Sequence, residues 1–480
     1  MTDLPWKWTA HKAVEELKSG RISPLELIDS CEKRIADTNN LVNALPTLCF
    51  DRARKFAKIY EQNKTKLLNN SQLPDYHLHG LPIAIKDLMP VKGVRSTMGS
   101  TLFKDNIPKK SDVLVSRLES NGAIIIGKSN TPEFGAGGNT FNDVFGATLN
   151  PWDTSKTCGG SSGGAAVALA TGQVWLAHGS DLGGSLRTPA SFCGVTGLRP
   201  SPGCVPKSSS KLPFHSLFVE GPMARNAIDV GLFLDAMAGH EYNDPLSYER
   251  SSISYKTAAE SQELPNKIAY SPNLGFAPVV KEVKDICENI SNLMASNGAT
   301  VELAEPDLSG AIDTFHTLRA AQFAAEKGNL LKDFSHQLKP ELIWNIQKGL
   351  TLTAQEIYEA EIKRGEIYSK FVEFFEDYDL LICPAAIVPP FDVNLRYVDE
   401  SAGVKFDNYI DWIAITYVLS LSSCPIAATP AGITADGLPV GVQLVAPPRR
   451  EDIALSSAGW LENKLELNKN VPMEPINNGS

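Results

Sequence analysis

Two glycine-rich clusters decide the fold of this chain: Thr157-Cys158-Gly159-Gly160-Ser161-Ser162-Gly163-Gly164 and Ser180-Asp181-Leu182-Gly183-Gly184-Ser185-Leu186-Arg187-Thr188-Pro189. Glycine has no Cβ, so such backbone can turn sharply and aim its N–H groups at one anion. A serine follows each Gly-Gly pair, at 161 and 185, which predicts one hydroxyl that attacks and a second that moves its proton. Two flexible loops are the alternative. The apolar, Ala-rich residues 165–170 between the clusters favour a buried helix instead.

The clusters resemble the signature of the amidase signature family, whose members cleave carboxamides as serine hydrolases or amidotransferases. The resemblance runs from about residue 80 to Leu438-Pro439-Val440-Gly441-Val442-Gln443-Leu444, and it is weakest between about residues 242 and 378. It implies a catalytic lysine, a serine after a cis peptide bond and a nucleophilic serine. By motif these fall on Lys86, Ser161 and Ser185.

Lys86 ends the apolar run Pro82-Ile83-Ala84-Ile85, which is typical of a buried strand. Burial penalises the ammonium form, so a lysine delivered there is pushed toward the neutral amine that can act as a base. The alternative is a surface salt bridge between Lys86 and the adjacent Asp87. The residues alone favour that salt bridge, and the resemblance favours catalysis.

The resemblance also implies supporting roles around the nucleophile. Backbone N–H groups of Leu182, Gly183, Gly184 and Ser185 would form an oxyanion hole. Asp181 and Arg187 are expected to be an orienting pair, with unrelated surface charges as the alternative. Ser162 would hydrogen-bond Lys86. His178, the histidine near the signature, lies in apolar strand-like sequence and is interpreted as a core residue.

A second stretch of sequence matches the phosphate-loop pattern of nucleotide-binding proteins. Gly122-Ala123-Ile124-Ile125-Ile126-Gly127-Lys128-Ser129 fits the pattern GxxxxGK followed by Ser or Thr. That motif needs a flexible loop and then a helix, whereas Ala-Ile-Ile-Ile favours a strand and the following Asn130-Thr131-Pro132 is a poor helix start. We therefore reject a nucleotide site.

The whole chain is predicted to be one α/β domain, residues 1–480, with a central mixed, mostly parallel sheet covered on both faces by helices. The parallel character is inferred from the strand, helix and strand expected over residues 266–303. Within the domain, helices over residues 1–75 pack on the body, residues 80–240 form the signature core and residues 466–480 are a tail. Ser23-Pro24-Leu25-Glu26 predicts a capped helix start.

Composition excludes several classes of protein. The 480 residues carry a formal charge of −10, which argues against a nucleic-acid partner because such binding needs clustered Lys and Arg. No secretion signal or spanning helix is apparent, so we expect a cytoplasmic protein without membrane contact.

Eight scattered cysteines indicate reduced thiols. His77 and His79 are too few for a metal site, and no cofactor is predicted.

Two functions follow from the resemblance. The first is an amidase that hydrolyses a small-molecule, non-peptide amide through an acyl-enzyme on Ser185. The second is the glutamine-hydrolysing subunit of a tRNA-dependent amidotransferase. Subunits of that kind have an acidic residue at about the position of Ile413, and isoleucine cannot hold an α-amino group. Asp411 lies close by, so a shift of the alignment by two residues would supply the acidic residue. Sequence after the signature, such as Leu198-Arg199-Pro200, looks more like the hydrolases.

A catalytically silent binding protein is disfavoured because all three catalytic residues are present. The pocket-lining residues that set specificity are expected within 130–150, 205–220 and 310–420. The resemblance also allows a homodimer, which no feature of the sequence decides.

Overall fold

The computed structural model describes residues 4–69, 73–208 and 211–478. Parts of four predictions therefore lie outside the described residues: the chain start at 1–3, a piece of the N-terminal segment at 70–72, residues 209–210 of one pocket-lining range, and 479–480 of the tail. In the part that is described, no helix has both the length and the apolar character needed to cross a membrane.

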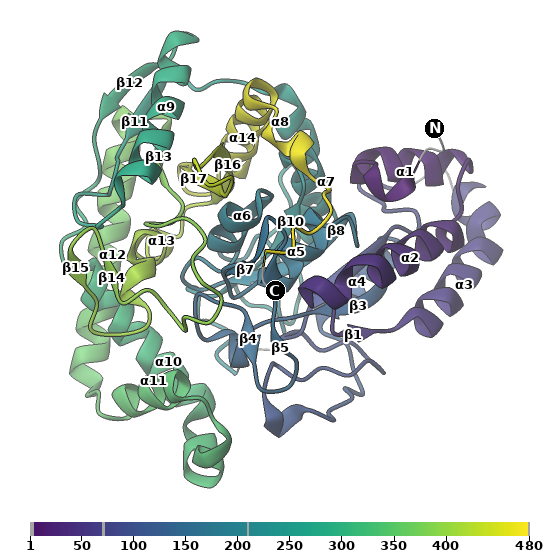
Figure 1. The fold of residues 1–480 in the computed structure, drawn as a ribbon, viewed down its shortest axis with the longest axis horizontal. Coiled ribbons are helices and arrows are strands. Elements are labelled where there is room, and N and C mark those ends of the chain that lie inside the picture. The colour runs from purple at the N-terminus through teal and green to yellow at the C-terminus, as the bar shows by residue number, and fades with distance from the viewer. Residues whose placement is uncertain (1–3, 70–72, 209–210, 479–480) are drawn as a thin grey trace.

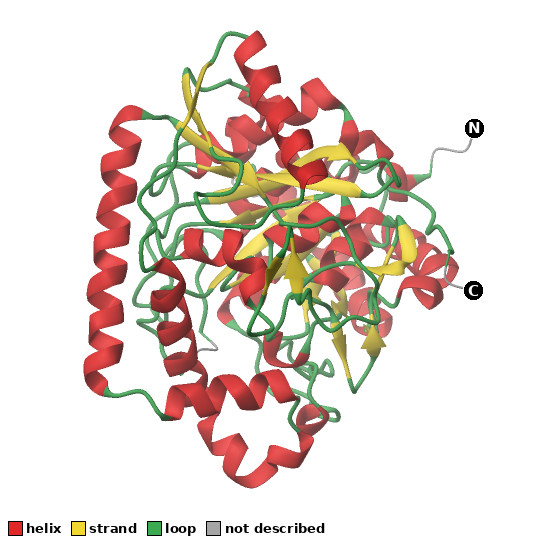
Figure 2. Cartoon of the chain, turned by 60° about the vertical axis from the view of Figure 1, so that its left-hand side comes forward, coloured by secondary structure: helices red, strands yellow, loops and turns green. Residues whose placement is uncertain are grey.

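One sheet of eleven strands organises the fold (Figures 1 and 2). Its spatial order is β1-β3-β2-β8-β10-β9-β16-β17-β13-β11-β12. In chain order the strands are β1 (Thr47–Leu48), β2 (Pro82–Lys86), β3 (Ile124–Ser129), β8 (Leu176–Asp181), β9 (Thr196–Arg199), β10 (Val219–Ala224), β11 (Lys267–Tyr270), β12 (Thr300–Leu303), β13 (Leu380–Pro384), β16 (Ile426–Ile433) and β17 (Pro439–Val445).

The single α/β domain with a mixed sheet is confirmed, but the expected parallel majority is wrong. Among the described strands of this sheet, six neighbouring pairs are antiparallel and four are parallel. The predicted unit over 266–303 is parallel, with α9 (Lys281–Ser296) between β11 and β12. Within the antiparallel middle of the sheet, the direction of the β16–β17 pair follows from its short connection. Only residues 434–438 join β16 to β17, too few for the crossover that a parallel pair requires.

Helices flank this sheet. The predicted N-terminal helices are present as α1 (Ala10–Ser19), α2 (Pro24–Val42) and α3 (Phe50–Asn69), and Ser23 and Glu26 form the expected capping box. The others are α4 (Val113–Ser120), α5 (Gly163–Ala170), α6 (Arg187–Cys193), α7 (Ala227–Met237), α8 (Tyr255–Ser261), α10 (Ala311–Phe334), α11 (Pro340–Leu350), α12 (Ala354–Asp377), α13 (Ala414–Ser420) and α14 (Glu451–Leu465).

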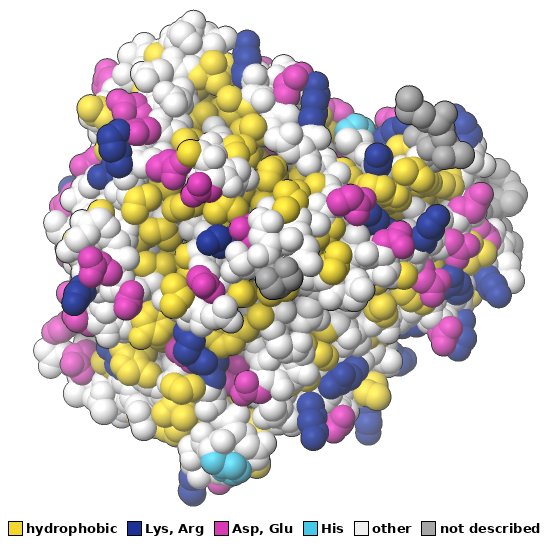
Figure 3. Space-filling model, viewed as in Figure 1, with side chains coloured by type: hydrophobic (Ala, Val, Ile, Leu, Met, Phe, Trp, Pro, Cys, Tyr) yellow, Lys and Arg dark blue, Asp and Glu magenta, His cyan; other side chains and the backbone are white. Residues whose placement is uncertain are grey.

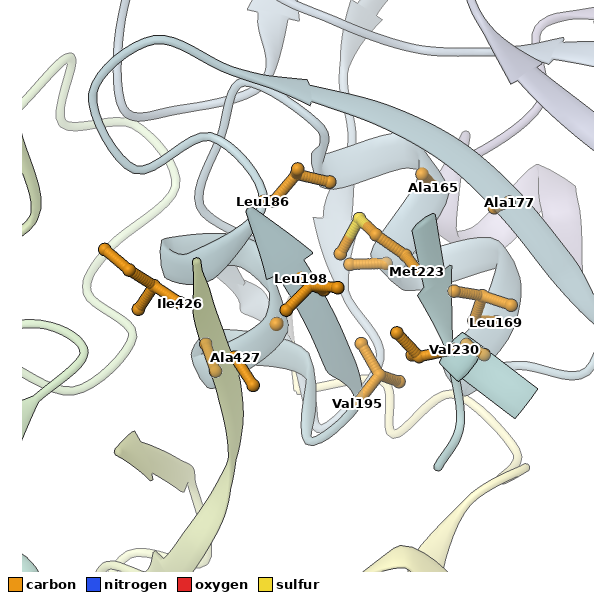
Figure 4. Packing of buried hydrophobic residues seen from close by; sticks show 14 of the residues in the cluster. Ala165, Leu169, Ala177, Leu186, Val195, Leu198, Met223, Val230, Ile426 and Ala427 are labelled. Carbon is orange, nitrogen blue, oxygen red and sulfur yellow. The ribbon is translucent and has the colours of Figure 1, made fainter. Parts of the chain in front are cut away.

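The signature lies in the middle of the core. Every residue of α5 is buried, which confirms a helix rather than a linker between the two glycine clusters. Figure 4 shows Ala165 and Leu169 of α5 beside Ala177 of β8 and Met223 of β10. Small side chains on α5 let it lie close to the sheet, so the two clusters at its flanks are held by packed structure.

Charged side chains of both signs are interspersed over the face in Figure 3, which is the view of Figure 1. Lys and Arg are not gathered into a single stripe there. A nucleic acid would need such a stripe to follow its phosphates.

Candidate active site

Lys86 lies at the carboxyl end of β2 and is fully buried. Its Nζ is 2.8 Å from Ser161 Oγ, 2.8 Å from Ser162 Oγ and 3.0 Å from Ser180 Oγ. Burial lowers the pKa of Lys86 to about 7, although the negative charges of Glu220 and Asp181 oppose the shift. The amine therefore sits among hydroxyls, and a large fraction of it is neutral near pH 7.

The alternative salt bridge between Lys86 and Asp87 is wrong. The Asp87 carboxylate accepts a hydrogen bond from Lys128 Nζ at 3.1 Å, and Lys128 also donates to Met89 O at 2.7 Å and Ser96 Oγ at 2.9 Å. The same contacts confirm that the stretch matching the phosphate-loop pattern is not a loop, because Lys128 belongs to β3 and its ammonium is buried among protein acceptors.

The first glycine cluster presents two adjacent serines to Lys86. The peptide bond between Gly160 and Ser161 is cis. A Cβ on Gly160 would come within 2.9 Å of the Asn139 backbone, so glycine is needed for the close approach of these two loops. Ser162 Oγ hydrogen-bonds the Ser180 carbonyl at 3.3 Å, and this orients it with its lone pairs toward the lysine. The predicted contact of Ser162 with Lys86 is thus present.

The second cluster forms the turn between β8 and α6, with Ser185 partly exposed at its tip. A Cβ on Gly184, whose φ is +122°, would come within 2.3 Å of Thr416 Oγ1. A Cβ on Gly183 would come within 2.9 Å of Phe315 Cζ. From the sequence, these glycines were expected only to build the anion hole; their lack of side chains also lets α10 and α13 pack directly on the turn.

The two clusters touch through their backbones. Ser162 N–H donates to the carbonyl of Ser185 at 3.2 Å. Ser161 and Ser185 both line one cavity of about 160 Å³. The structure thus brings Lys86, Ser161 and Ser185 to one place from three separate parts of the chain.

The predicted oxyanion donors need one correction. The N–H of Gly184 already donates to Asp181 Oδ1 at 2.9 Å, so it is not available to a substrate. The N–H groups of Leu182, Gly183 and Ser185 have no acceptor among the described residues. These three N–H groups remain available as donors, and Leu182 and Ser185 line the cavity.

Asp181 and Arg187 form a buried pair rather than surface charges. Arg187 Nη2 donates to Asp181 Oδ1 at 3.0 Å and its Nε to Oδ2 at 3.1 Å, and neither side chain is exposed. Arg199 Nη1 adds a contact of 3.3 Å, which the sequence did not reveal. Burial would raise the pKa of Asp181, but the two arginines outweigh it and hold the pKa well below its usual range. The carboxylate in turn accepts the N–H of Leu186 at 3.0 Å and so fixes the turn.

The ranges 130–150, 205–220 and 310–420, which were predicted to line the pocket, each contribute residues to the cavity wall. Two further lining residues, Leu88 and Met98, come from the segment after β2, which was not predicted to line it. The wall combines the serines with apolar and charged side chains: Leu88, Met98, Phe134, Gly135, Ser161, Ser180, Leu182, Ser185, Lys207, Phe218, Glu220, Arg319, Gln322, Phe323, Glu326 and Lys327.

His178 is a core residue, as predicted, and is hydrogen-bonded at both ring nitrogens. The backbone N–H of Lys86 donates to Nδ1 at 3.3 Å, and Nε2 lies 2.9 Å from Glu220 Oε2. Sequence reasoning missed Glu220. The alternating pattern of β10 could have placed it on one side of the strand, but only the pairing of β10 with β8 reveals its partner.

The resemblance placed the residue that would hold a glutamine α-amino group at or near Ile413. Neither Ile413 nor Asp411 lines the cavity. Asp411 is engaged elsewhere, 2.8 Å from His316 Nε2 and 2.7 Å from Asn408 Nδ2.

In the part of the chain that the structure describes, no group of three or more His, Cys, Asp or Glu side chains is arranged to hold a metal ion.

Comparison with known proteins identifies close similarity over nearly the whole chain. The sequence model of the family described as Amidase matches residues 26–455. The chain is 33% identical over 468 residues to an acylamidase of Rhodococcus erythropolis, and 96% of each chain is covered. It is 29% identical over 489 residues to one chain of the glutamyl-tRNA(Gln) amidotransferase of Halothermothrix orenii, with 97% of this chain and 98% of that one covered.

Solved structures agree with the sequence comparison. The fold matches a bacterial aryl acylamidase of the amidase signature enzymes with a TM-score of 0.89 and 26% identity, and the match covers 98% of this chain and 99% of that one.

Proposed function

Given that the chain belongs to the Amidase family and is a hydrolase of amide C–N bonds, we propose that it acts through an acyl-enzyme on Ser185, with Ser161 and Lys86 relaying protons. The environment of Lys86 is the observation that carries this proposal. Its amine is buried, its partners are three hydroxyls, and burial lowers its pKa to about 7.

Hydrogen-bond counting supports Ser161 as the proton partner. A neutral amine has two N–H donors and one lone pair, so one of its three hydroxyl neighbours must donate to it. Ser162 Oγ is turned toward the Ser180 carbonyl and receives the Ser180 N–H at 3.3 Å. Of the other two hydroxyls, Ser161 belongs to the cluster whose backbone contacts Ser185. We therefore assign to Ser161, rather than to Ser180, the hydroxyl that gives its hydrogen to Lys86.

The reaction begins when Lys86 takes the proton of Ser161, and Ser161 takes that of Ser185. Ser185 Oγ then attacks the amide carbon, and the N–H groups of Leu182, Gly183 and Ser185 stabilise the oxyanion. As the C–N bond breaks, Ser161 returns a proton to the leaving nitrogen. Water, activated by the same relay, hydrolyses the ester and releases the carboxylic acid. Asp181 and Arg187 hold the turn throughout.

The substrate is proposed to be a small carboxylic amide. A cavity of about 160 Å³ suits a compact acyl group, and Leu88, Met98 and Phe134 offer it apolar contacts. An acylamidase of Rhodococcus erythropolis is among the relatives, which is consistent with this class.

Glutamine hydrolysis within a tRNA-dependent amidotransferase is the second candidate, because chains of such enzymes are also relatives. The engagement of Asp411 with His316 and its absence from the cavity favour the amidase.

One experiment separates the two functions. The purified protein alone is assayed against glutamine, short aliphatic amides, anilides and carbamates, with Ser185→Ala as the matched inactive control. We expect turnover of at least one simple amide by the wild type and none by S185A. Turnover confined to glutamine and dependent on added partner chains would establish the amidotransferase instead, and retained turnover by S185A would place the nucleophile elsewhere.

A further inference from the structure

Next to Lys86, β8 and β10 bring together two titratable side chains, His178 and Glu220, that the proposed mechanism does not use. The strands are antiparallel, and Pro222 of β10 is opposite His178 of β8. Glu220 lies two residues from Pro222 on the same strand, so its side chain points to the same face. Both side chains are buried, with 1% of His178 and 5% of Glu220 exposed.

His178 connects Glu220 to the backbone of the lysine. A backbone N–H can only donate, so His178 Nδ1 must accept from Lys86 N at 3.3 Å. The ring hydrogen is then on Nε2, 2.9 Å from Glu220 Oε2. This chain of contacts fixes the end of β2, from which the Lys86 side chain reaches Ser161.

Glu220 differs from the other carboxylate near the lysine. Asp181 is neutralised by Arg187 and Arg199. Among the described residues, Glu220 forms no ion pair with a lysine or an arginine, and it acts on Lys207 of the cavity wall only through a longer-range attraction. Its negative charge is therefore less compensated than that of Asp181 and acts more directly on the site.

We propose that Glu220 is a positioning residue for the Lys86 base: it holds the lysine backbone through His178, and its carboxylate stabilises the ammonium that Lys86 becomes when it takes the Ser161 proton. This inference rests on the proposed function. A buried amine with no nearby negative charge would be too weak a base to keep that proton, and a general base works best when its pKa lies near the operating pH. The opposing effects of burial and of Glu220 on the pKa of Lys86 agree with this role.

The titratable groups that contact Lys86 or act on its charge come from two strands: His178 and Asp181 on β8, and Glu220 on β10. Lys128 of the neighbouring β3 is paired with Asp87.

The test is the pH dependence of kcat/KM in Glu220→Gln, which keeps the shape and the hydrogen bond to His178 but removes the charge. We expect the midpoint of the acid limb to move to lower pH by about half a unit or more, because the ammonium loses a stabilising charge. The plateau kcat is expected to fall because the base is weaker. A merely structural role would lower activity without moving the midpoint.

Two further variants complete the test. Glu220→Asp keeps the charge and should return the midpoint toward that of the wild type. Glu326→Gln removes a carboxylate from the same cavity wall, and its midpoint should stay in place whatever it does to KM. A midpoint unmoved in folded E220Q, or moved equally in E326Q, would overturn the inference.

Lys86→Ala distinguishes this failure from failure of the proposed function. If K86A abolishes the acid limb while E220Q leaves its midpoint unmoved, only the role of Glu220 is lost. If K86A keeps the wild-type activity and limb, Lys86 is not the base and the proposed mechanism itself is wrong.

Discussion

At the scale of the residue, the proposed mechanism makes activity depend on the protonation of the Lys86 amine. Burial lowers its pKa to about 7. Below that pH the amine is protonated and cannot accept the Ser161 proton, and above it the amine is neutral and can. We therefore expect kcat/KM to rise with pH, with its midpoint near 7, when hydrolysis of a simple amide is measured from roughly pH 5 to pH 9.

Replacement of the lysine provides a sharper test. Lys86→Ala should lower kcat/KM at neutral pH by about 10²- to 10⁴-fold, the usual contribution of a general base. Partial recovery is expected at high pH, where hydroxide can take the serine proton. Circular dichroism serves as the control for folding. Activity unchanged at neutral pH would remove the lysine from the mechanism.

Sequence reasoning succeeded best for residues inside the motifs. Lys86, Ser161 and Ser162 meet as the resemblance implied. Arg199 and Glu220 were missed because each contacts its partner through the tertiary fold: Arg199 lies 18 residues from Asp181, and Glu220 lies 42 residues from His178. Pattern within one element carries no information about such pairs.

At the scale of the element, the turn that carries Ser185 packs against α13. Gly184 has a φ of +122°, and a Cβ there would meet Thr416 Oγ1 at 2.3 Å. Gly184→Ala should therefore lower the free energy of unfolding by about 1–3 kcal/mol and reduce activity, since the turn must shift to relieve the contact. Urea unfolding and kcat measure the two effects.

Gly437→Ala is the matched control. Its φ of +81° is also positive, but a Cβ there would meet nothing within 4 Å. G437A should show the backbone cost alone, with unchanged kcat. Equal stability and activity of G184A and G437A would mean that packing against Thr416 does not hold the turn.

The elements themselves were predictable to different degrees. Capping residues predicted the start of α2, and apolar sequence predicted the buried α5, because those signals are local. The available N–H groups of the turn were predicted less well. Gly184 N–H was assigned to the oxyanion, whereas the Asp181 carboxylate, three residues earlier, accepts it. Which acceptor an N–H chooses depends on the three-dimensional path of the turn.

At the scale of the whole molecule, the antiparallel centre of the sheet joins distant parts of the chain. β16 and β17, near the C-terminus, lie between β9 and β13. The sequence supported parallel pairing only for one local unit, and strand direction elsewhere depends on connections whose course the sequence does not specify. The expectation of a mostly parallel sheet was wrong because it applied a correct local prediction to the whole sheet.

Gln443 of β17 ties this C-terminal part to the signature. Its Oε1 accepts from Arg187 Nη1 at 2.7 Å, and its Nε2 donates to Pro384 O at 3.0 Å. Gln443→Leu leaves buried polar groups short of partners and should lower the free energy of unfolding by about 1–3 kcal/mol. Thermal unfolding should remain a single transition, because the sheet is shared by the whole chain.

Gln355→Leu is the control, since Gln355 is exposed and its side chain bonds only Glu359 at 2.7 Å among the described residues. Its stability should stay close to that of the wild type. Two separate transitions in Q443L would contradict a single cooperative domain.

The central claim is that the substrate acyl group passes through Ser185, and mass spectrometry of the quenched reaction tests it most directly. An amide that is turned over, or an activated ester of the same acid, is mixed with the enzyme and the reaction is stopped in acid. The account predicts that the wild type gains the mass of one acyl group on the peptide that contains Ser185, and that S185A gains none. An acyl group on any other residue, or turnover by S185A without an adduct, would contradict it.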